Sequence, residues 1–457
     1  MSKTIADAVI CGAGIAGVSV AYQLAVKHQM KKIMLVDPLP PLTMTSDKST
    51  ECYRNWWPGP GDAMVRLMNR SIDILEQLHQ EAPGRLPMNR RGYVYATADP
   101  SSVERMIAEA KENTELGAGT LRIHRGSPDD PVYIPFSEHG IFDAPDGADI
   151  LLDIDLIRQH FPHLTEKTLA VLHTRRCGWF SAQQFGMYML EKAKESGVQL
   201  INGRVEDISV ENNKVTAIKI EGKDEAQTIS TRIFVNTAGP MQRNVGRMMN
   251  VDIPVFSELH IKMAFNDSQH AIPRDMPLTI WNDPVRLTWS EEEKEFWAES
   301  EDTRWLLEEM PAGVHGRAEG KGSCLLQWDY RTKITEPVFP IPVDELFPEI
   351  VLRGMVNVIP GLEVYLSKLP QPSIDGGYYT RTEENRPLIG PLPVDGAYML
   401  GGVGGFGMQV SCGASDLLAA HITNSELPDY APAFLFSRYE DPDYKKLLDN
   451  WGSSGQI

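Results

Sequence analysis

Apolar positions near the start of the chain fall into two short runs separated by a helical repeat. Residues 6–11 form an apolar run of strand length, which predicts a buried strand. A helical repeat of apolar residues occupies 18–27, and a second apolar run at 32–36 ends at Asp37. This order predicts a β-α-β unit of about thirty residues.

The same patterns predict further elements downstream. Amphipathic helices are expected at 62–78 and at 101–116, the second with a serine cap. The pair Asn212-Asn213 suits a turn between strands, which are expected at 198–202, 208–211 and 214–221. After residue 370 the chain returns to a glycine-rich α/β texture, with a helix expected at 412–423.

The middle of the chain, residues 255–369, differs in composition from the rest, because tryptophan and proline are frequent there. Its acidic segment 291–309 interleaves Phe296, Trp297 and Trp305 with glutamates. This pattern predicts a solvated amphipathic helix of a second domain. A surface that docks a partner is the alternative.

Length and charge narrow the class of protein. The 457 residues are too many for one ordinary core, so we expect two domains. The net charge of -18 argues against a protein that binds phosphate backbones or anionic membranes. The five cysteines are scattered and form no C-x-x-C pair, so neither a zinc knuckle nor a disulfide framework is expected.

The uncharged stretch 8–26 is long enough to suggest a membrane helix, but it contains three glycines and follows no basic leader. A strand, a tight turn and a helix start explain it better. Residues 1–4 leave no room for a signal peptide before it. We therefore expect a cytoplasmic protein without a membrane span.

The first candidate motif is Gly12-Ala13-Gly14-Ile15-Ala16-Gly17, directly after the first strand. Gly12 allows the tight turn, Gly14 lets a pyrophosphate approach, and Gly17 lets the helix pack on the strand. The helix N-terminus offers free N–H groups to phosphates. Asp37 stands where a ribose hydroxyl would bind, which favours a dinucleotide without a 2′-phosphate and so disfavours NADP.

Other motifs, taken with this one, resemble the D-amino acid oxidase and sarcosine oxidase superfamily. The order and spacing of the motifs carry the resemblance together, and they span nearly the whole chain. They are the glycine motif near the N-terminus, the hydroxyl-rich segment 45–50, the segment 191–198 leading into Gly203-Arg204-Val205, the segment Val235-Asn236-Thr237-Ala238-Gly239-Pro240, and the C-terminal segments 381–390 and 404–409.

The resemblance implies FAD as the cofactor and no metal. It implies an α/β fold: a Rossmann-like FAD domain of the GR2 type, with an interleaved substrate domain that contains a mixed or antiparallel sheet. We expect residues 1–87, 150–255 and 370–457 in the FAD domain, and 88–149 and 256–369 in the substrate domain. The expected FAD contacts are Gly12, Gly14, Ile15, Ala16, Gly17, Asp37, Ser46, Ser49, Thr50, Val205, Ala238, Gly239, Gly404, Gly405, Phe406, Gly407, Met408 and Gln409.

The chain departs from the family pattern at three places. Gln409 stands where sarcosine oxidases have a lysine that pairs with the substrate carboxylate. Gly376-Gly377 stands where they have the cysteine that is linked to the flavin. Cys52 falls near the histidine linkage of dimethylglycine dehydrogenases, so a thioether to the flavin is a minor alternative to a plain buried cysteine.

Candidate substrate contacts are Arg54, His260, Tyr379 and Arg381. Arg54 could clamp a carboxylate, with Trp56 and Trp57 beside an amine, although a structural arginine is an equal alternative. His260 could equally be a satisfied structural histidine. Arg381 could instead pair with Glu383 or Glu384.

The resemblance implies oxidation of the C–N bond of an amine or amino acid, of the secondary, N-alkyl or D-amino acid type. A hydride passes to flavin N5 and the imine then hydrolyses. Two alternatives remain: a flavoprotein that oxidises a hydroxyl, such as a 2-hydroxy acid or glycerol phosphate, and a non-catalytic flavin-binding assembly factor. Expected partners are the small-molecule substrate and O2 or an electron-acceptor protein, without nucleic acid; homo-oligomerisation is left open.

Overall fold

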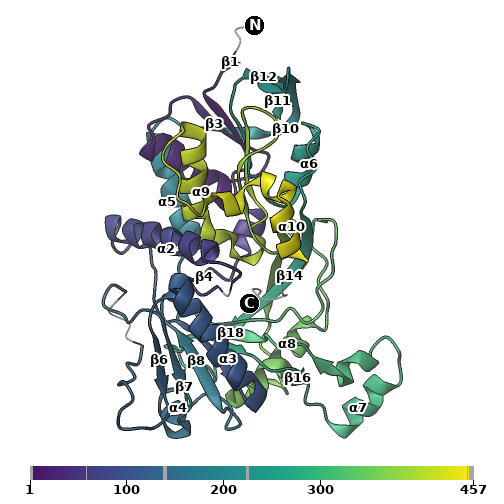
Figure 1. Cartoon of the computed structure of the whole chain (residues 1–457). Helices are drawn as coiled ribbons and strands as arrows, with labels where there is room; N and C mark the ends of the chain where they lie inside the picture. Colours follow the sequence, from purple (N-terminus) through teal and green to yellow (C-terminus); the bar gives the residue numbers. More distant parts are fainter. Residues whose placement is uncertain (1–3, 58, 137–140, 223–225, 450, 452–457) are drawn as a thin grey trace.

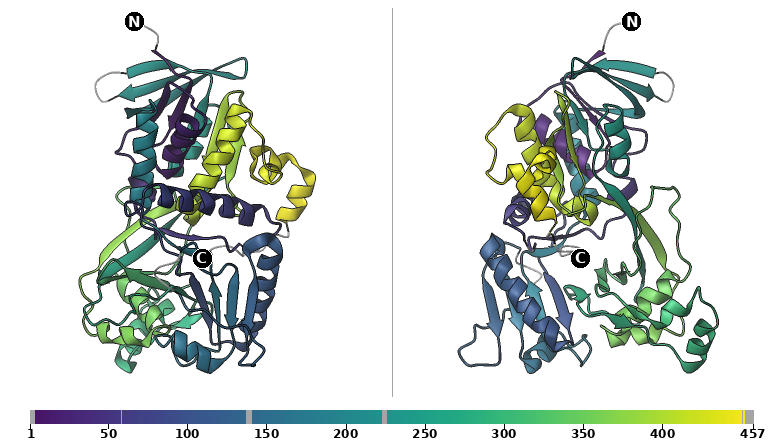
Figure 2. Two further views of the ribbon diagram at one scale, coloured as in Figure 1. Left: turned by 90° about the vertical axis from the view of Figure 1, so that its left-hand side faces the viewer. Right: turned by 45° about the vertical axis from the view of Figure 1, so that its right-hand side comes forward.

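The computed structural model describes residues 4–57, 59–136, 141–222, 226–449 and 451. Two layers of α/β structure lie one above the other, with helix α2 (Ala63–Glu81) running between them (Figures 1 and 2). The described helices are α1 Ile15–Tyr22, α2 Ala63–Glu81, α3 Pro100–Asn113, α4 Ile154–His160, α5 Ala182–Glu195, α6 Gln242–Arg247, α7 Glu291–Ala298, α8 Phe347–Val356, α9 Gly407–Thr423 and α10 Pro442–Leu448.

The first sheet has the order β1-β12-β11-β10-β3-β2-β13-β22-β21. At its centre β10, β3, β2, β13 and β22 are parallel, as the predicted β-α-β unit requires. Its strands are β1 Thr4–Ile5, β2 Ala8–Cys11, β3 Ile33–Asp37, β10 Gln199–Glu211, β11 Lys214–Gly222, β12 Ala226–Ser230, β13 Phe234–Asn236, β21 Leu388–Pro391 and β22 Ala397–Gly401.

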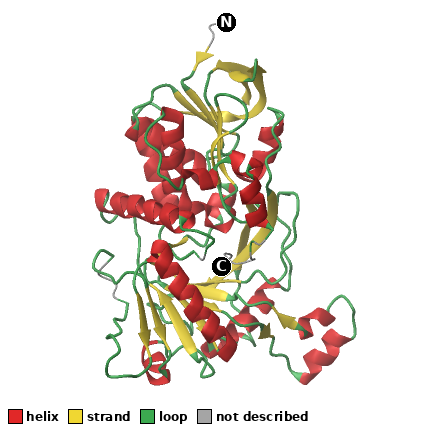
Figure 3. Ribbon diagram, in the orientation of Figure 1, coloured by secondary structure: helices red, strands yellow, loops and turns green. Residues whose placement is uncertain are grey.

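Helices cover this sheet because its central strands are apolar throughout. Every residue of β2 is buried, and α1, α5 and α9 pack together beside the sheet (Figure 3). The first helix continues beyond Tyr22 as a π-helical turn, Gln23–Lys27. Asn212 and Asn213 form the predicted turn between β10 and β11, both with positive φ (51° and 61°), which asparagine tolerates.

The second sheet is mixed and has the order β20-β14-β19-β18-β15-β5-β8-β7-β6. Short pairs β4–β9 and β16–β17 lie outside it. These strands are β4 Cys52–Arg54, β5 Tyr93–Thr97, β6 Leu121–His124, β7 Ala148–Leu151, β8 Ala170–Thr174, β9 Cys177–Trp179, β14 Phe256–Asn266, β15 Leu278–Trp281, β16 Val285–Arg286, β17 Glu309–Met310, β18 His315–Glu319, β19 Ser323–Gln327 and β20 Ser373–Arg381.

Strand pairing moves the expected domain boundaries. β7 straddles residue 150, where the range 150–255 that we assigned to the FAD domain begins, and β8 lies inside that range. Both strands nevertheless pair within the second sheet, β8 with β5 and with β7. β20 likewise pairs with β14 rather than with the first sheet. Residues 148–174 and 373–381 therefore contribute to the second sheet, and the division into two domains with these boundaries stays a proposal.

Two helices differ from their sequence prediction. α3 is capped by Asp99, whose side chain accepts from the N–H of Ser101, so the cap is not a serine; Pro100 fits the first helical position, where no N–H is needed. The acidic segment forms a short helix, α7, and then a 3₁₀ turn at Arg304–Leu307 rather than one long helix. Trp297 packs against the second core, and its neighbour Phe296 is 62% exposed.

Within the described part of the chain, every helix is too short or too polar to traverse a lipid bilayer. The five cysteines, all described, are free thiols.

Candidate active site

The glycine turn between β2 and α1 is packed too closely for any side chain at its first and last glycines. Gly12 has a φ of +104°, and a Cβ there would lie 2.5 Å from the carbonyl oxygen of Thr237. A Cβ on Gly17 would collide with the carbonyl of Gly12. The turn therefore brings the start of α1 against the end of β13, as phosphate binding at a helix N-terminus requires.

Two side chains hold the N–H groups of this turn. Asp37 Oδ2 accepts from Ala13 N at 2.7 Å, and Ser46 Oγ accepts from Ile15 N at 3.0 Å. Asp37 pairs in register with Asn202 of β10, so Val205 lies three residues further along, buried at the same edge of the sheet. The residues predicted for the ADP half of FAD thus meet at the carboxyl ends of parallel strands.

A groove, which we call the cofactor groove, runs from the start of α1 to the start of α9. It is lined by segments 14–16, 45–49, 237–242, 378–380 and 400–408. Ten of the predicted FAD contacts line it: Gly14, Ile15, Ala16, Ser46, Ser49, Gly239, Gly404, Gly405, Gly407 and Met408. The predicted contact Ala238 instead donates its N–H to Asn236.

Gln242 gives an independent indication that the groove takes a ligand. It is 1% exposed, and its side-chain oxygen has no hydrogen-bond partner among the described residues. The amide lies against Gly401, where a Cβ would collide with it, and it lines the cofactor groove. An unpaired buried amide costs about 1–3 kcal/mol, so a polar ligand that pairs with it would be stabilised. Sequence reasoning missed Gln242, since a glutamine in a short helix carries no local signal.

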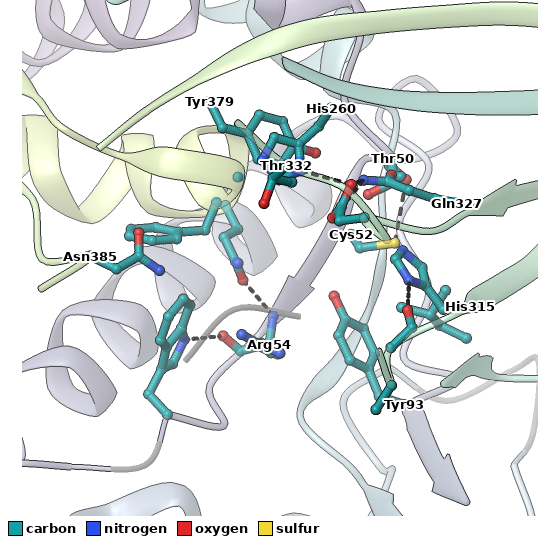
Figure 4. Close-up of a pocket in the computed structure, with 18 residues that line it drawn as sticks. Thr50, Cys52, Arg54, Tyr93, His260, His315, Gln327, Thr332, Tyr379 and Asn385 are labelled. Atoms are coloured by element: carbon teal, nitrogen blue, oxygen red, sulfur yellow. Dashed lines mark hydrogen bonds and ion pairs between the residues drawn. The ribbon is translucent and has the colours of Figure 1, made fainter. Parts of the chain in front are cut away.

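A cavity of about 210 Å³, the inner cavity, adjoins the cofactor groove, because Tyr379 and Gly405 line both (Figure 4). Its walls come from separate sheets: β4, in the short β4–β9 pair, contributes Cys52 and Arg54, and β14, in the second sheet, contributes His260. The predicted FAD contacts Thr50, Phe406 and Gln409 also line it. The site therefore consists of a groove for a long cofactor and a chamber that adjoins it.

Arg54 is buried in the wall of the inner cavity and fixed by aromatic neighbours. Its guanidinium lies 4.5 Å from the ring centre of Trp57 and donates to the hydroxyl of Tyr95 at 3.0 Å. Trp57 in turn meets Phe406 edge-on at 4.7 Å. Stacking of this kind orients a planar guanidinium, which suits bidentate binding of a carboxylate.

His260 lies on another wall, between two carboxylates. Its Nδ1 is 2.8 Å from Asp329 Oδ1 and its Nε2 is 3.9 Å from Glu258 Oε2. The imidazole stacks on Tyr379, with ring centres 3.9 Å apart. Burial alone would lower the pKa of His260, but Asp329 and Glu258 outweigh it and raise the pKa to about 9. His260 is therefore an imidazolium at neutral pH.

Arg381 lines neither the inner cavity nor the cofactor groove. Its Nε is 2.9 Å from Glu258 Oε2, and it donates to the backbone oxygen of Glu383 at 3.3 Å. The expectation that Arg381 touches substrate is therefore not supported by its position. The carboxylate partner is Glu258, which lies opposite the C-terminal end of β20 in the strand register, rather than the side chain of Glu383 or Glu384.

Several cavity residues come from strands whose role the sequence did not reveal. Tyr93 lies on β5, His315 on β18 and Gln327 on β19, and Asp329 follows β19. Each strand reaches the site only through pairing with distant strands, which leaves no local pattern. Burial lowers the pKa of His315, so this second histidine is neutral.

Cys52 lines the inner cavity but not the cofactor groove. Its thiol donates to Thr50 O at 3.3 Å, and burial raises its pKa. Among the residues with described positions, no group of three or more His, Cys, Asp or Glu side chains could hold a metal ion.

The second sheet holds the loop that precedes Cys52. The ammonium group of Lys262 on β14 donates to the carbonyls of Lys48 (2.8 Å) and Ser49 (2.7 Å). Arg317 on β18 donates to the carbonyl of Thr50 at 2.8 Å. Ser49 also lines the cofactor groove, so this loop links the two halves of the site.

Comparisons with known proteins agree with this geometry. A family model described as FAD-dependent oxidoreductase, DAO, matches residues 7–421. No curated protein matches the sequence.

Similar solved structures include L-proline dehydrogenase from P. horikoshii (17% identity, TM-score 0.73, covering 96% of this chain and 98% of that one) and glycine oxidase from Bacillus cereus (15%, 0.69, 94% and 98%). Another is an FAD-bound L-α-glycerophosphate oxidase from Mycoplasma pneumoniae (12%, 0.64, 93% and 97%). At these sequence identities, the similarity between the structures shows the fold alone.

Proposed function

Because the chain belongs to the family of FAD-dependent oxidoreductases, we propose that it oxidises the carbon–nitrogen bond of an amine or amino acid. The family and its cofactor, FAD, are established by the match across nearly the whole chain. The substrate class is our inference. One observation supports a carboxylate on the substrate: the guanidinium of Arg54 lies in the wall of a chamber that adjoins the cofactor groove. The sequence resemblance supports the choice of a C–N bond.

When bound in the groove, FAD supplies the acceptor for a hydride from the substrate α-carbon. Arg54 binds the substrate carboxylate and so fixes the position of the α-carbon. Trp57, Phe406 and Tyr379 line the chamber and exclude water around the reacting bond. Gly404 and Gly405 line the groove without side chains and would let backbone N–H groups approach a bound flavin, where such donors would stabilise negative charge.

The role of His260 is to position its neighbours. It does not abstract a proton from the substrate, because its imidazole is already protonated at neutral pH. Its place on Tyr379 fixes that ring at the junction of chamber and groove. The amine is oxidised in its neutral form, and the imine hydrolyses in water. O2 or another acceptor would take up the two electrons removed from the substrate.

Anaerobic reduction of the bound flavin tests the proposal. We expect the visible flavin bands to bleach with one or more of secondary amines, N-methyl amino acids, and D- and L-amino acids. The panel includes 2-hydroxy acids and glycerol 3-phosphate. Bleaching by these hydroxy compounds, with no response to any amine, would replace C–N oxidation by hydroxyl oxidation as the function.

A further inference from the structure

The inner cavity continues into a second, larger space on the surface. This outer cavity, of about 500 Å³, is lined by segments 328–335 and 342–347 together with Leu259 and Ile261. Asp329 and Thr332 line both cavities, so the two spaces meet at these residues. A substrate longer than the inner cavity can therefore extend past them.

The charged side chains of the inner cavity lie at two separate ends of that cavity. Among the described lining residues, Arg54, His260 and Asp329 carry charge at neutral pH. Burial raises the pKa of Tyr93, Tyr379 and Cys52, which keeps those groups neutral. Arg54 lies apart from Thr332 and His260 across the chamber in Figure 4. The anionic group thus stands at the exit, away from the carboxylate-binding guanidinium.

The carboxylate of Asp329 can accept further hydrogen bonds. Its Oδ1 faces His260 Nδ1 at 2.8 Å, and Gln327 Nε2 lies at the outer limit of hydrogen bonding, 3.4 and 3.5 Å from the two oxygens. A carboxylate accepts about four hydrogen bonds in all. The Asp329 side chain is 33% exposed, whereas that of His260 is 3% exposed, so the carboxylate rather than the imidazolium faces incoming ligands.

We propose that the substrate is an amino acid with a distal cationic group, bound at one end by Arg54 and at the other by the carboxylate of Asp329. This deepens the proposed function and rests on it. His260 holds the carboxylate in place from behind, with Glu258 on its far side. Arg331 and Lys333 outnumber Asp344 among the charged residues that line the outer cavity beyond Asp329. This excess of positive charge disfavours a cation there, so the distal group stops at the junction.

Three chains of matched length test the charge preference: norleucine, lysine and 2-aminoadipate, which end in a methyl, an ammonium and a carboxylate. Each is tried as D and L forms and as Nα-methyl derivatives, by anaerobic flavin reduction and by the spectral change on binding. We expect lysine-type compounds to be preferred over norleucine-type compounds by about tenfold or more, the effect of one charge-assisted hydrogen bond. A preference for 2-aminoadipate, or no preference, would overturn the proposal.

The variant Asp329→Asn should abolish the preference for lysine while bound FAD and the melting temperature report that the fold is intact. Asp329→Glu should restore part of it. Thr332→Val, in the same passage, alters shape without charge and should keep the rank order. If Asp329→Asn retains the full preference, Asp329 does not bind the distal group. If no amine reduces the flavin in any form, the proposed function fails, and this inference falls with it.

Discussion

The backbone N–H of Arg54 donates a 2.6 Å hydrogen bond to Oε1 of Gln409, which ties β4 to the first turn of α9. Gln409 therefore takes a place in the chamber as a structural acceptor, where the related sarcosine oxidases use a lysine. A lysine has no acceptor atom and could not make this bond.

Replacing Gln409 should therefore lower stability. In Gln409→Leu the buried N–H of Arg54 loses its acceptor, which should decrease the free energy of unfolding by about 1–3 kcal/mol in urea titrations. Gln409→Glu keeps an acceptor oxygen and is the matched control. Equal unfolding midpoints for wild type and Gln409→Leu would show that this bond contributes nothing.

Arg54 should determine substrate binding rather than cofactor binding. For a carboxylate-bearing substrate, Arg54→Ala should lower kcat/KM by about 30-fold or more, a loss of about 2 kcal/mol, while FAD stays bound. Arg54→Lys keeps the charge without the planar fork and should recover only part of the activity. Unchanged steady-state kinetics in Arg54→Ala would remove the carboxylate clamp.

Gly12 should tolerate no side chain. Gly12→Ala combines the strain of a positive φ, about 1 kcal/mol, with a collision against Thr237, and should abolish FAD retention. Gly197→Ala is the matched control: its φ is +102°, but its Cβ would have no atom within 4 Å. It should show the strain alone in thermal melts. Similar losses in both variants would mean that close packing at Gly12 is unimportant.

Gln242 should affect FAD binding and apoprotein stability in opposite ways. Gln242→Leu removes a buried amide oxygen that has no described partner, so the apoprotein should be as stable as wild type or more stable. FAD should bind about tenfold more weakly, because a hydrogen bond to the cofactor is lost. Fluorescence titration of the apoprotein with FAD measures this. Unaltered affinity would exclude contact between Gln242 and the cofactor.

His260 should make stability depend on pH in the alkaline range. Its pKa is raised from 6.5 to about 9 on folding, so its stabilising contribution is complete below pH 6.5 and is lost as the pH rises through 9. The difference in unfolding free energy between wild type and His260→Gln should accordingly shrink between those values. A difference that stays constant from pH 6 to 10 would mean that His260 is not charged in the folded protein.

Local patterns were enough to predict the β-α-β unit of the first sheet and the turn between β10 and β11. The glycine motif, Asp37 and the Asn212-Asn213 turn all depend on neighbours close in sequence, and each has the predicted structure. The strand order of the second sheet could not be predicted from local patterns. Its order depends on pairings such as β5 with β8, which are set by packing between distant segments.

The residues of the candidate site show the same difference between those that could be predicted from the sequence and those that could not. Arg54, His260 and Tyr379 were predicted as substrate contacts and line the inner cavity. Arg54 and Tyr379 stand close in sequence to the segments 45–50 and 381–390 that carry the family resemblance. Asp329 and Gln242 were missed, since their environments arise from strand register and from a short helix against Gly401. Arg381 was predicted as a substrate contact but lines neither space, and its partner Glu258 is 123 residues away.

The hydrogen bonds from Lys262 to the carbonyls of Lys48 and Ser49 have a consequence for engineering the substrate choice of this protein. A substitution on β14 that never touches FAD can still displace the loop that does, and so shift the affinity and the redox potential of the flavin. Libraries meant to change substrate choice should therefore leave Lys262 unaltered, or monitor the absorbance of bound flavin in every variant.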